Sequence, residues 1–126
     1  MGNEIKDFDD LNAWKKAHGL AVSIYEMTKQ FPKEEMFGLI SQIRRSATSV
    51  GANISEGFAR FHAKDKIRFY YHARASAAEV MNHLYVAKDL GYCSIVEFEE
   101  LYKQYKAERM LINGLIRSIE NNINTF

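Results

Sequence analysis

The chain has 126 residues, 47% of them hydrophobic and 26% charged, a composition that fits one globular domain and excludes a disordered or membrane-embedded chain. Its 17 Lys and Arg residues and 16 Asp and Glu residues leave a net charge of +1, which neither requires nor excludes a nucleic-acid partner. One proline and seven glycines provide few turn residues, which disfavours an all-β fold.

The first periodic segment predicts a helix over residues 10–30. Its expected inner stripe recurs at steps of three and four: Leu11, Trp14, His18, Ala21, Tyr25 and Thr28. Pro32 ends this segment, because proline disfavours helical geometry at Phe31 and suits the first turn of a following helix.

The second segment predicts a helix over residues 33–61 and has the most regular pattern in the chain. Two heptad rows interleave, one of Met36, Ile43, Val50 and Gly57 and the other of Ile40, Ala47, Ile54 and Phe61. Small residues crowd its middle, and they let neighbouring backbones approach closely: Ser46, Ala47, Thr48, Ser49, Gly51, Ala52, Ser55 and Gly57. Close packing within one bundle and contact with another subunit both remain open as explanations.

Two further helices are expected over residues 64–90 and 95–122. The inner stripe of the third is Tyr70, Ala73, Ala77, Val80, Leu84 and Ala87, and that of the fourth is Phe98, Leu101, Tyr105, Ile112, Leu115 and Ile119. Gly91 is a typical helix stop, and Ser94 with Glu97 forms a capping-box pattern. Four amphipathic helices with short connections predict an all-α, antiparallel up-down four-helix bundle, in a single domain over residues 1–126.

The motifs of catalytic and metal sites are missing from the sequence. A di-metal bundle would need Glu-x-x-His motifs, and the chain has none. Cys93 is the only cysteine, so the chain can form neither an intrachain disulfide nor a thiolate metal cluster. Gly-rich phosphate loops are also absent. We therefore expect no catalytic residues, no metal, no cofactor and no enzymatic activity.

The location of the protein is inferred from its N-terminus and its hydropathy. The first residues, MGNEIKDFDD, are acidic and polar, unlike a signal peptide. No apolar run approaches the roughly 20 residues that span a bilayer. Together with the single cysteine, these observations predict a cytoplasmic protein that does not bind membranes.

Several polar residues fall near the apolar seams, where an unpaired charge would be costly. We expect a structural polar network of Asn53, Glu56, Arg74 and Glu108. Within it, Arg74 should meet a carboxylate, with Glu56 the first candidate and Glu108 the second.

Basic residues interleaved with aromatic ones suit phosphate contacts and base stacking. The segment ARFHAKDKIRFYYHAR has this character, although an ordinary solvated helix start would look similar. The candidate nucleic-acid contacts are Lys15, Lys16, Arg44, Arg45, Arg60, Lys66 and Arg68. For Arg44 and Arg45, contact with RNA and inter-subunit salt bridges remain competing interpretations.

The segment FPKEEMFGLISQIRRSATSVGANISEGFAR resembles the bacterial four-helix-bundle family of 23S rRNA intervening-sequence proteins, and the similarity extends over nearly the whole chain. The resemblance implies a homo-oligomer, a pentameric ring, with no established enzymatic activity. A related branch, the accessory variability determinants of diversity-generating retroelements, is basic and associates with nucleic acid. The resemblance thus favours structured RNA such as rRNA as a partner, with a protein-interaction or accessory scaffold subunit as the alternative.

Overall fold

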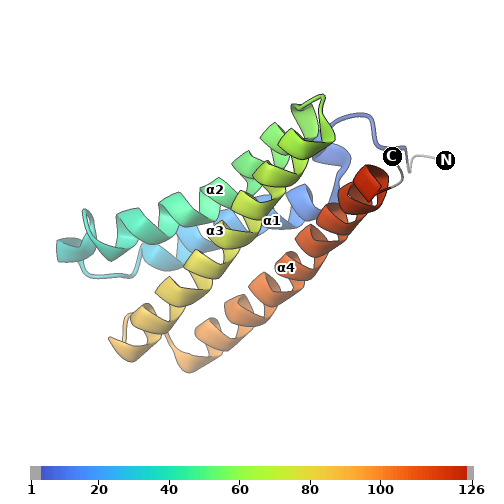
Figure 1. Ribbon diagram of the computed structural model, residues 1–126. Coiled ribbons are helices and arrows are strands. Elements are labelled where there is room, and N and C mark those ends of the chain that lie inside the picture. The colour runs from blue at the N-terminus through green and yellow to red at the C-terminus, as the bar shows by residue number, and fades with distance from the viewer. Residues whose placement is uncertain (1–3, 125–126) are drawn as a thin grey trace.

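The protein is a bundle of four long helices, seen in a computed structural model that describes residues 4–124. The predicted domain extends beyond these residues at both ends. The helices are α1 (Asn12–Thr28), α2 (Leu39–Ala59), α3 (Ala63–Asp89) and α4 (Ile95–Asn124), and they alternate in direction (Figure 1). Two short 3₁₀ helices precede α1 and α2, η1 (Phe8–Asp10) and η2 (Lys33–Glu35). The predicted all-α four-helix bundle is confirmed.

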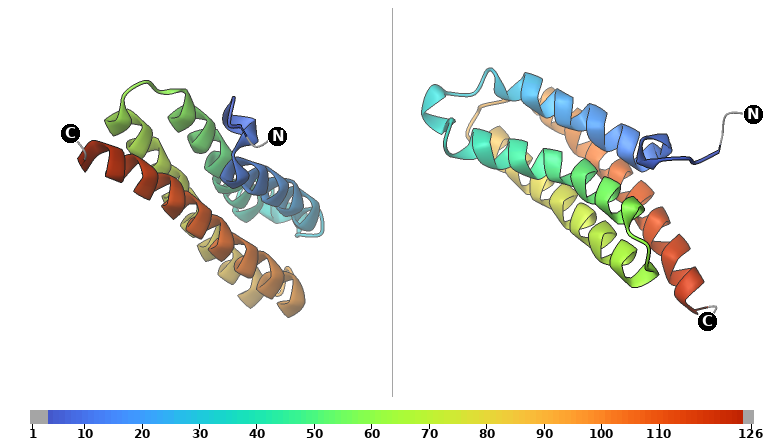
Figure 2. Two further views of the ribbon diagram at one scale, coloured as in Figure 1. Left: turned by 90° about the vertical axis from the view of Figure 1, so that its right-hand side faces the viewer. Right: turned by 90° about the horizontal axis from the view of Figure 1, so that it is seen from above.

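The helices are not packed equally. The α2–α3 pair makes the most extensive contact, whereas α1 packs on α2 and touches α4 much less. The start of α1, the α2–α3 connection and the end of α4 lie at one end of the bundle, and the α1–α2 and α3–α4 connections lie at the other (Figures 1 and 2). These two ends carry different side chains.

The α2 helix begins later than its pattern predicts, at Leu39 rather than at residue 33. Residues 33–35 form η2, and the chain then turns before α2 starts. The Glu35 carboxylate accepts a hydrogen bond from the backbone N–H of Leu39 at 3.1 Å. A Cβ at Gly38 would lie 2.7 Å from that carboxylate, so the absence of a side chain there makes the contact possible. The heptad prediction consequently fails at Met36, whose side chain is exposed.

The inner stripe of α1 is rotated from the predicted one by one residue, roughly 100° around the helix axis. The buried residues of α1 are Ala13, Ala17, Leu20, Ala21, Ile24, Met27 and Thr28. His18 and Tyr25, predicted to face inward, are exposed. The small alanines let α1 lie against Gly51, where the indole of Trp14 also packs. The Trp14 ring in turn stacks on His18, with the ring centroids 4.9 Å apart.

The small residues of α2 are divided between the core and the surface. Ser46, Ala47, Gly51 and Gly57 are buried within the bundle, which confirms close packing inside one chain at these positions. Thr48 and Ala52 face outward.

The ends of α3 and α4 follow the sequence signals. Gly91 has a φ of +76°, and the N–H of Tyr92 donates to the carbonyl of Ala87 at 2.9 Å, the pattern of a glycine helix stop. Ser94 and Glu97 exchange hydrogen bonds as a capping box. The predicted inner stripe of α3 is buried throughout.

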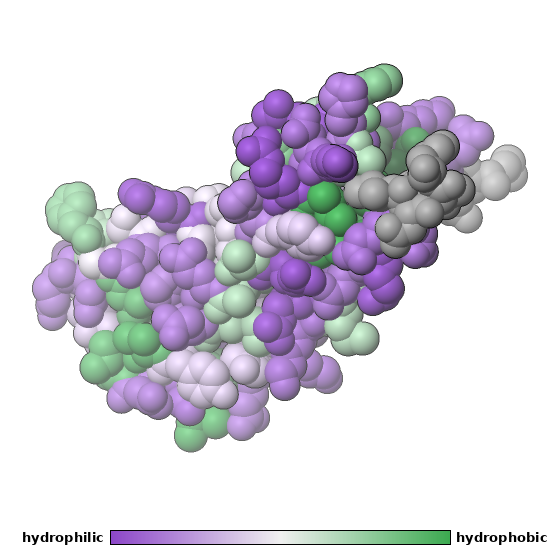
Figure 3. Space-filling view, in the orientation of Figure 1, coloured by the Kyte–Doolittle hydropathy of each residue, from purple (hydrophilic) through white to green (hydrophobic). Residues whose placement is uncertain are grey.

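Apolar side chains also remain on the surface, in separate hydrophobic spots among hydrophilic residues on the face shown in Figure 3. The most exposed are Phe37 at 97% and Phe61 at 90%. No helix within residues 4–124 combines the length and the apolar character that crossing a bilayer would require.

Candidate nucleic-acid interface

The connection between α2 and α3 gathers several of the predicted basic residues. The α2 helix ends at Ala59, two residues before its predicted end, and Arg60 adopts an extended backbone with its N–H bonded to the carbonyl of Gly57. His62 occupies the position before α3 but makes no side-chain cap. We call five basic and aromatic side chains around this turn the cationic corner: Arg60, Phe61, Lys64, Arg68 and Phe69.

Two guanidinium groups lie against one aromatic ring in the cationic corner. Arg60 and Arg68 place their guanidinium carbons 4.6 and 5.1 Å from the ring centroid of Phe69. Each also has a carboxylate at 3.8 Å, Glu56 for Arg60 and Asp65 for Arg68. All four charged side chains are at least 45% exposed, so these ion pairs are weak, and both arginines remain able to contact a phosphate.

Phe61 lies at the tip of the cationic corner. The heptad pattern predicts it in the seam between helices, and this prediction is wrong because α2 ends two residues before it. Its ring is almost fully exposed and stands edge-on to His62, with centroids 5.1 Å apart. Lys64, which the sequence analysis did not single out as a contact residue, is exposed three residues later in the chain.

The ammonium group of Lys66 makes hydrogen bonds within the fold rather than facing solvent. It donates to the carbonyl of Phe58 at 2.7 Å and to that of Gly57 at 3.4 Å, both in the last turn of α2. Burial lowers the pKa of Lys66. The ammonium therefore satisfies the carbonyl of Phe58 at the end of α2 and is a second donor to that of Gly57, which also accepts the N–H of Arg60. Its predicted role as a phosphate contact is not supported by this position.

Lys15 and Lys16 differ in whether the side chain faces solvent or contacts another part of the chain. Lys15 is exposed in the first turn of α1, and the start of α1 lies at the same end of the bundle as the α2–α3 connection (Figure 2). Lys16 is half-buried, and its ammonium donates to the side-chain carbonyl of Gln104 on α4. Of this pair, only Lys15 is exposed.

Arg44 and Arg45 lie in the other half of α2, far along the helix from the cationic corner. Arg44 donates to the hydroxyl of Thr28 at 2.8 Å and to the carbonyl of Tyr25 at 3.4 Å, and it lies over the Tyr25 ring. It thus ties α2 to the end of α1. Arg45 is exposed. The seven predicted contact residues consequently do not form one continuous patch.

The predicted polar network does not form as one unit. Arg74 donates to the side-chain oxygen of Asn113 at 2.9 Å instead of meeting Glu56 or Glu108, so the expected Arg74–carboxylate pair is wrong. Glu56 instead faces Arg60, and Asn53 donates to the backbone and hydroxyl of Ser49. The hydroxyls of Ser49 and Ser76 lie 2.9 Å apart and form a polar link between α2 and α3 that sequence analysis missed.

Glu108 is fully buried in the centre of the bundle. Burial raises its pKa to about 8, partly offset by the positive charge of Lys16. Within the described residues, neither its carboxyl oxygens nor the hydroxyl of Tyr105 has a hydrogen-bond partner. At neutral pH this side chain is therefore mostly a neutral carboxylic acid.

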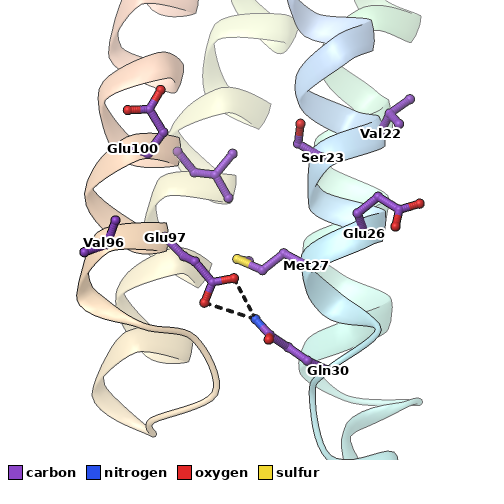
Figure 4. A pocket seen from close by; sticks show the side chains of 9 residues that line it. Val22, Ser23, Glu26, Met27, Gln30, Val96, Glu97 and Glu100 are labelled. Carbon is purple, nitrogen blue, oxygen red and sulfur yellow. Dashed lines mark hydrogen bonds between the residues drawn. The ribbon is translucent and has the colours of Figure 1, made fainter.

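A groove of about 570 Å³ separates α1 from α4 at the end of the bundle opposite the cationic corner (Figure 4). Its walls are Val22, Ser23, Glu26, Met27, Gln30, Val96, Glu97, Glu100 and Leu101. The Gln30 amide donates to both carboxylate oxygens of Glu97 across it, at 3.2 and 3.0 Å. Hydrogen bonds from the Ser94 backbone and from Gln30 lower the pKa of Glu97, so the groove has an anionic rim that would repel phosphate.

No three side chains of His, Cys, Asp or Glu come close enough together within the described part of the chain to hold a metal ion. Burial raises the pKa of the Cys93 thiol, which keeps this side chain in its unreactive protonated form at neutral pH.

The sequence matches the model of the 23S rRNA-intervening sequence protein family over residues 9–114. The chain belongs to this family. Among solved structures, it is similar to a protein of unknown function of the S23 ribosomal protein family from Bacteroides thetaiotaomicron, with 26% identity and a TM-score of 0.77. That similarity covers 83% of this chain and 95% of the other. No curated protein matches the chain.

The seven predicted contact residues and Lys64 thus fall into two groups. Lys16, Arg44 and Lys66 bind other parts of the same chain. Lys15, Arg60, Lys64 and Arg68 keep exposed charges at one end of the bundle, and Arg45 keeps one elsewhere on α2. The exposed group at the bundle end, with its two exposed or half-exposed aromatic rings, is the best candidate for contact with a nucleic acid.

Proposed function

We propose that this protein is a non-enzymatic, cytoplasmic homo-oligomer, a pentamer, that binds structured RNA such as rRNA through the cationic corner and Lys15. The observation that carries the proposal is the pair of exposed guanidiniums of Arg60 and Arg68 on the ring of Phe69. Arginine combines charge and a planar surface, so it can contact a phosphate and stack on a base. The family name, which refers to 23S rRNA, supports the choice of RNA.

Oligomerisation would strengthen such binding. The exposed charges of one chain are few, but a ring repeats them around its axis, and their fields add.

The experiment is a fluorescence-anisotropy titration of a labelled fragment of 23S rRNA at low and at physiological salt. Binding should weaken steeply with salt, because each phosphate contact contributes about 0.7–0.9 to the slope of log K against log salt concentration. The double variant Arg60→Ala/Arg68→Ala should reduce both affinity and slope. The matched control is the double variant Lys29→Ala/Lys33→Ala, which removes two exposed cations from the α1–α2 connection, at the end of the bundle opposite the corner. Absence of binding at low salt would contradict the proposal.

The α1–α4 groove favours a second candidate, an accessory scaffold that docks another protein. Its apolar floor and anionic rim suit a protein surface better than RNA. A scaffold of this kind would not bind the RNA, its binding to the protein partner would depend little on salt, and substitution of Leu101 by a charged residue would abolish that binding.

A further inference from the structure

The ring of Phe61 is exposed to solvent and does not pack in the core of the bundle. The side chain is 90% exposed, and its one ring neighbour within the described residues is His62. Leaving an aromatic ring in water is unfavourable, because aromatic side chains gain most when they bury their large apolar surface. A ring exposed to this degree is therefore available to a ligand.

Hydrogen bonds fix the backbone on both sides of Phe61. On one side of Phe61, the N–H of Arg60 is bonded to the carbonyl of Gly57, and on the other the carbonyl of His62 accepts the N–H of Lys66 in the first turn of α3. The ammonium group of Lys66 also donates hydrogen bonds to the carbonyls of Gly57 and Phe58 in the last turn of α2. The turn is thus fixed from both helices, so little backbone freedom would be lost when a ligand binds.

The charges around Phe61 suit a nucleotide. Arg60 directly precedes Phe61, and Lys64 and Arg68 lie in the first two turns of α3, which begins two residues after Phe61. Arg60 and Arg68 are also close to each other, because both lie over the ring of Phe69. The positive charges of Arg60 and Arg68 are partly offset by Glu56 and Asp65, in ion pairs 3.8 Å long that leave all four groups exposed. A ring flanked by cations can stack with a base while the cations hold the phosphates on either side.

The other highly exposed phenylalanine provides a comparison within the same chain. Phe37 is 97% exposed at the opposite end of the bundle, but Glu34, Glu35 and Lys33 are its charged neighbours in sequence, so its surroundings are not cationic. It matches Phe61 in chemistry and exposure and differs in charge environment.

We propose that Phe61 stacks on an unpaired base of the bound RNA, with Arg60 and Arg68 contacting the phosphates that flank it. This inference rests on the proposed RNA-binding function and names its ligand class, a single-stranded loop, bulge or end. Bases within an A-form helix are stacked on one another and their faces are closed to a protein side chain, so a duplex would contact the cations alone.

The test compares two fluorescein-labelled RNAs, a single strand of mixed sequence and a blunt duplex formed from the same strand and its complement. Phe61→Ala should weaken binding of the single strand by about 5- to 150-fold, the range that one lost base–aromatic stack produces. The affinity of this variant for the duplex should stay within twofold of that of the unaltered protein. The slope of log K against log salt concentration should be unchanged for both RNAs. Phe37→Ala should leave both RNAs unaffected.

A second readout detects stacking directly. In Phe61→Trp the new indole should be quenched when the single strand binds, whereas in Phe37→Trp it should not. Both variants contain the same native Trp14, so its contribution is the same in the comparison.

Each failure has a distinct meaning. If the unaltered protein binds neither RNA at low salt, the proposed function itself fails. If it binds both and Phe61→Ala loses neither or loses both equally, RNA binding stands but base stacking is wrong. If Phe61→Ala changes the oligomeric state in sedimentation, Phe61 is a subunit contact and the inference is overturned.

Discussion

Gly57 and Tyr70 lie so close together that a Cβ at position 57 would fall 2.7 Å from ring carbon Cε1 of Tyr70 and 3.1 Å from the Cβ of Phe69. The absence of a side chain at Gly57 therefore sets the distance between the end of α2 and the start of α3. Because Phe69 also receives the two arginines, the same contact positions the cationic corner.

Gly57→Ala should lower the free energy of unfolding by about 1–3 kcal/mol, because the added methyl group overpacks a closed contact. The matched control is Gly19→Ala in α1, where an added Cβ would meet no described atom within 4 Å. That variant should raise stability by up to about 1 kcal/mol through helix propensity. Urea denaturation measures both, and equal stability of the two variants would contradict the prediction.

Glu108→Gln should change how stability depends on pH. The folded pKa of Glu108 is about 8 against an ordinary value of 4.5, so the folded state holds a proton that the unfolded state releases in this interval. The group therefore lowers stability as pH rises from 4.5 to 8, by up to about 1.4 kcal/mol per pH unit. The difference in unfolding free energy between the variant and the parent should grow over this range, and parallel pH profiles would contradict the assignment.

Lys66→Met should lower stability by about 1 kcal/mol while leaving RNA affinity nearly unchanged. The methionine keeps an apolar stem near Phe58 but loses the charged hydrogen bonds to the end of α2. Arg68→Ala should behave in the opposite way, with stability within about 0.5 kcal/mol of the parent and weaker RNA binding. Thermal unfolding and anisotropy, measured on the same samples, separate the two roles.

Arg44→Ala should cost about 1–2 kcal/mol, because it removes the bonds to Thr28 and Tyr25 that join α2 to α1. Arg45→Ala should stay within about 0.5 kcal/mol of the parent, since this side chain is exposed. Chemical denaturation checks the contrast, which disappears if the two arginines have equivalent roles.

Charge reversal then decides what Arg45 faces. Arg45→Glu that dissociates the oligomer in sedimentation would assign it to a subunit contact. Loss of RNA binding with an intact oligomer would assign it to the nucleic-acid interface instead.

The sequence predicts the fold well where one rule determines the outcome. Apolar periodicity identifies the buried stripe of α3, and Gly91, Ser94 and Glu97 mark the end of that helix and the start of the next. The heptad rows fail only where α2 itself is shorter than the pattern, at Met36 and Phe61. Periodicity describes which face a residue takes if the helix continues, but it does not show where the helix stops.

The candidate site was harder to predict, because it depends on contacts between segments. Nothing in the sequence distinguishes Lys66, which bonds the end of α2, from Arg68, which faces solvent two residues later. Arg74 likewise finds the amide of Asn113 rather than a carboxylate, through the alignment of α3 with α4. The partner that each of these side chains contacts depends on the relative positions of the helices. These positions are fixed only when the bundle packs.

The stacking of Trp14 on His18 beside Gly51 has a practical consequence for spectroscopy. Because Trp14 is the only tryptophan, all the native indole emission comes from the seam between α1 and α2. Helical circular dichroism instead averages over the four helices. A change of emission that precedes the loss of helical signal would therefore reveal α1 detaching as a separate step, without any added dye.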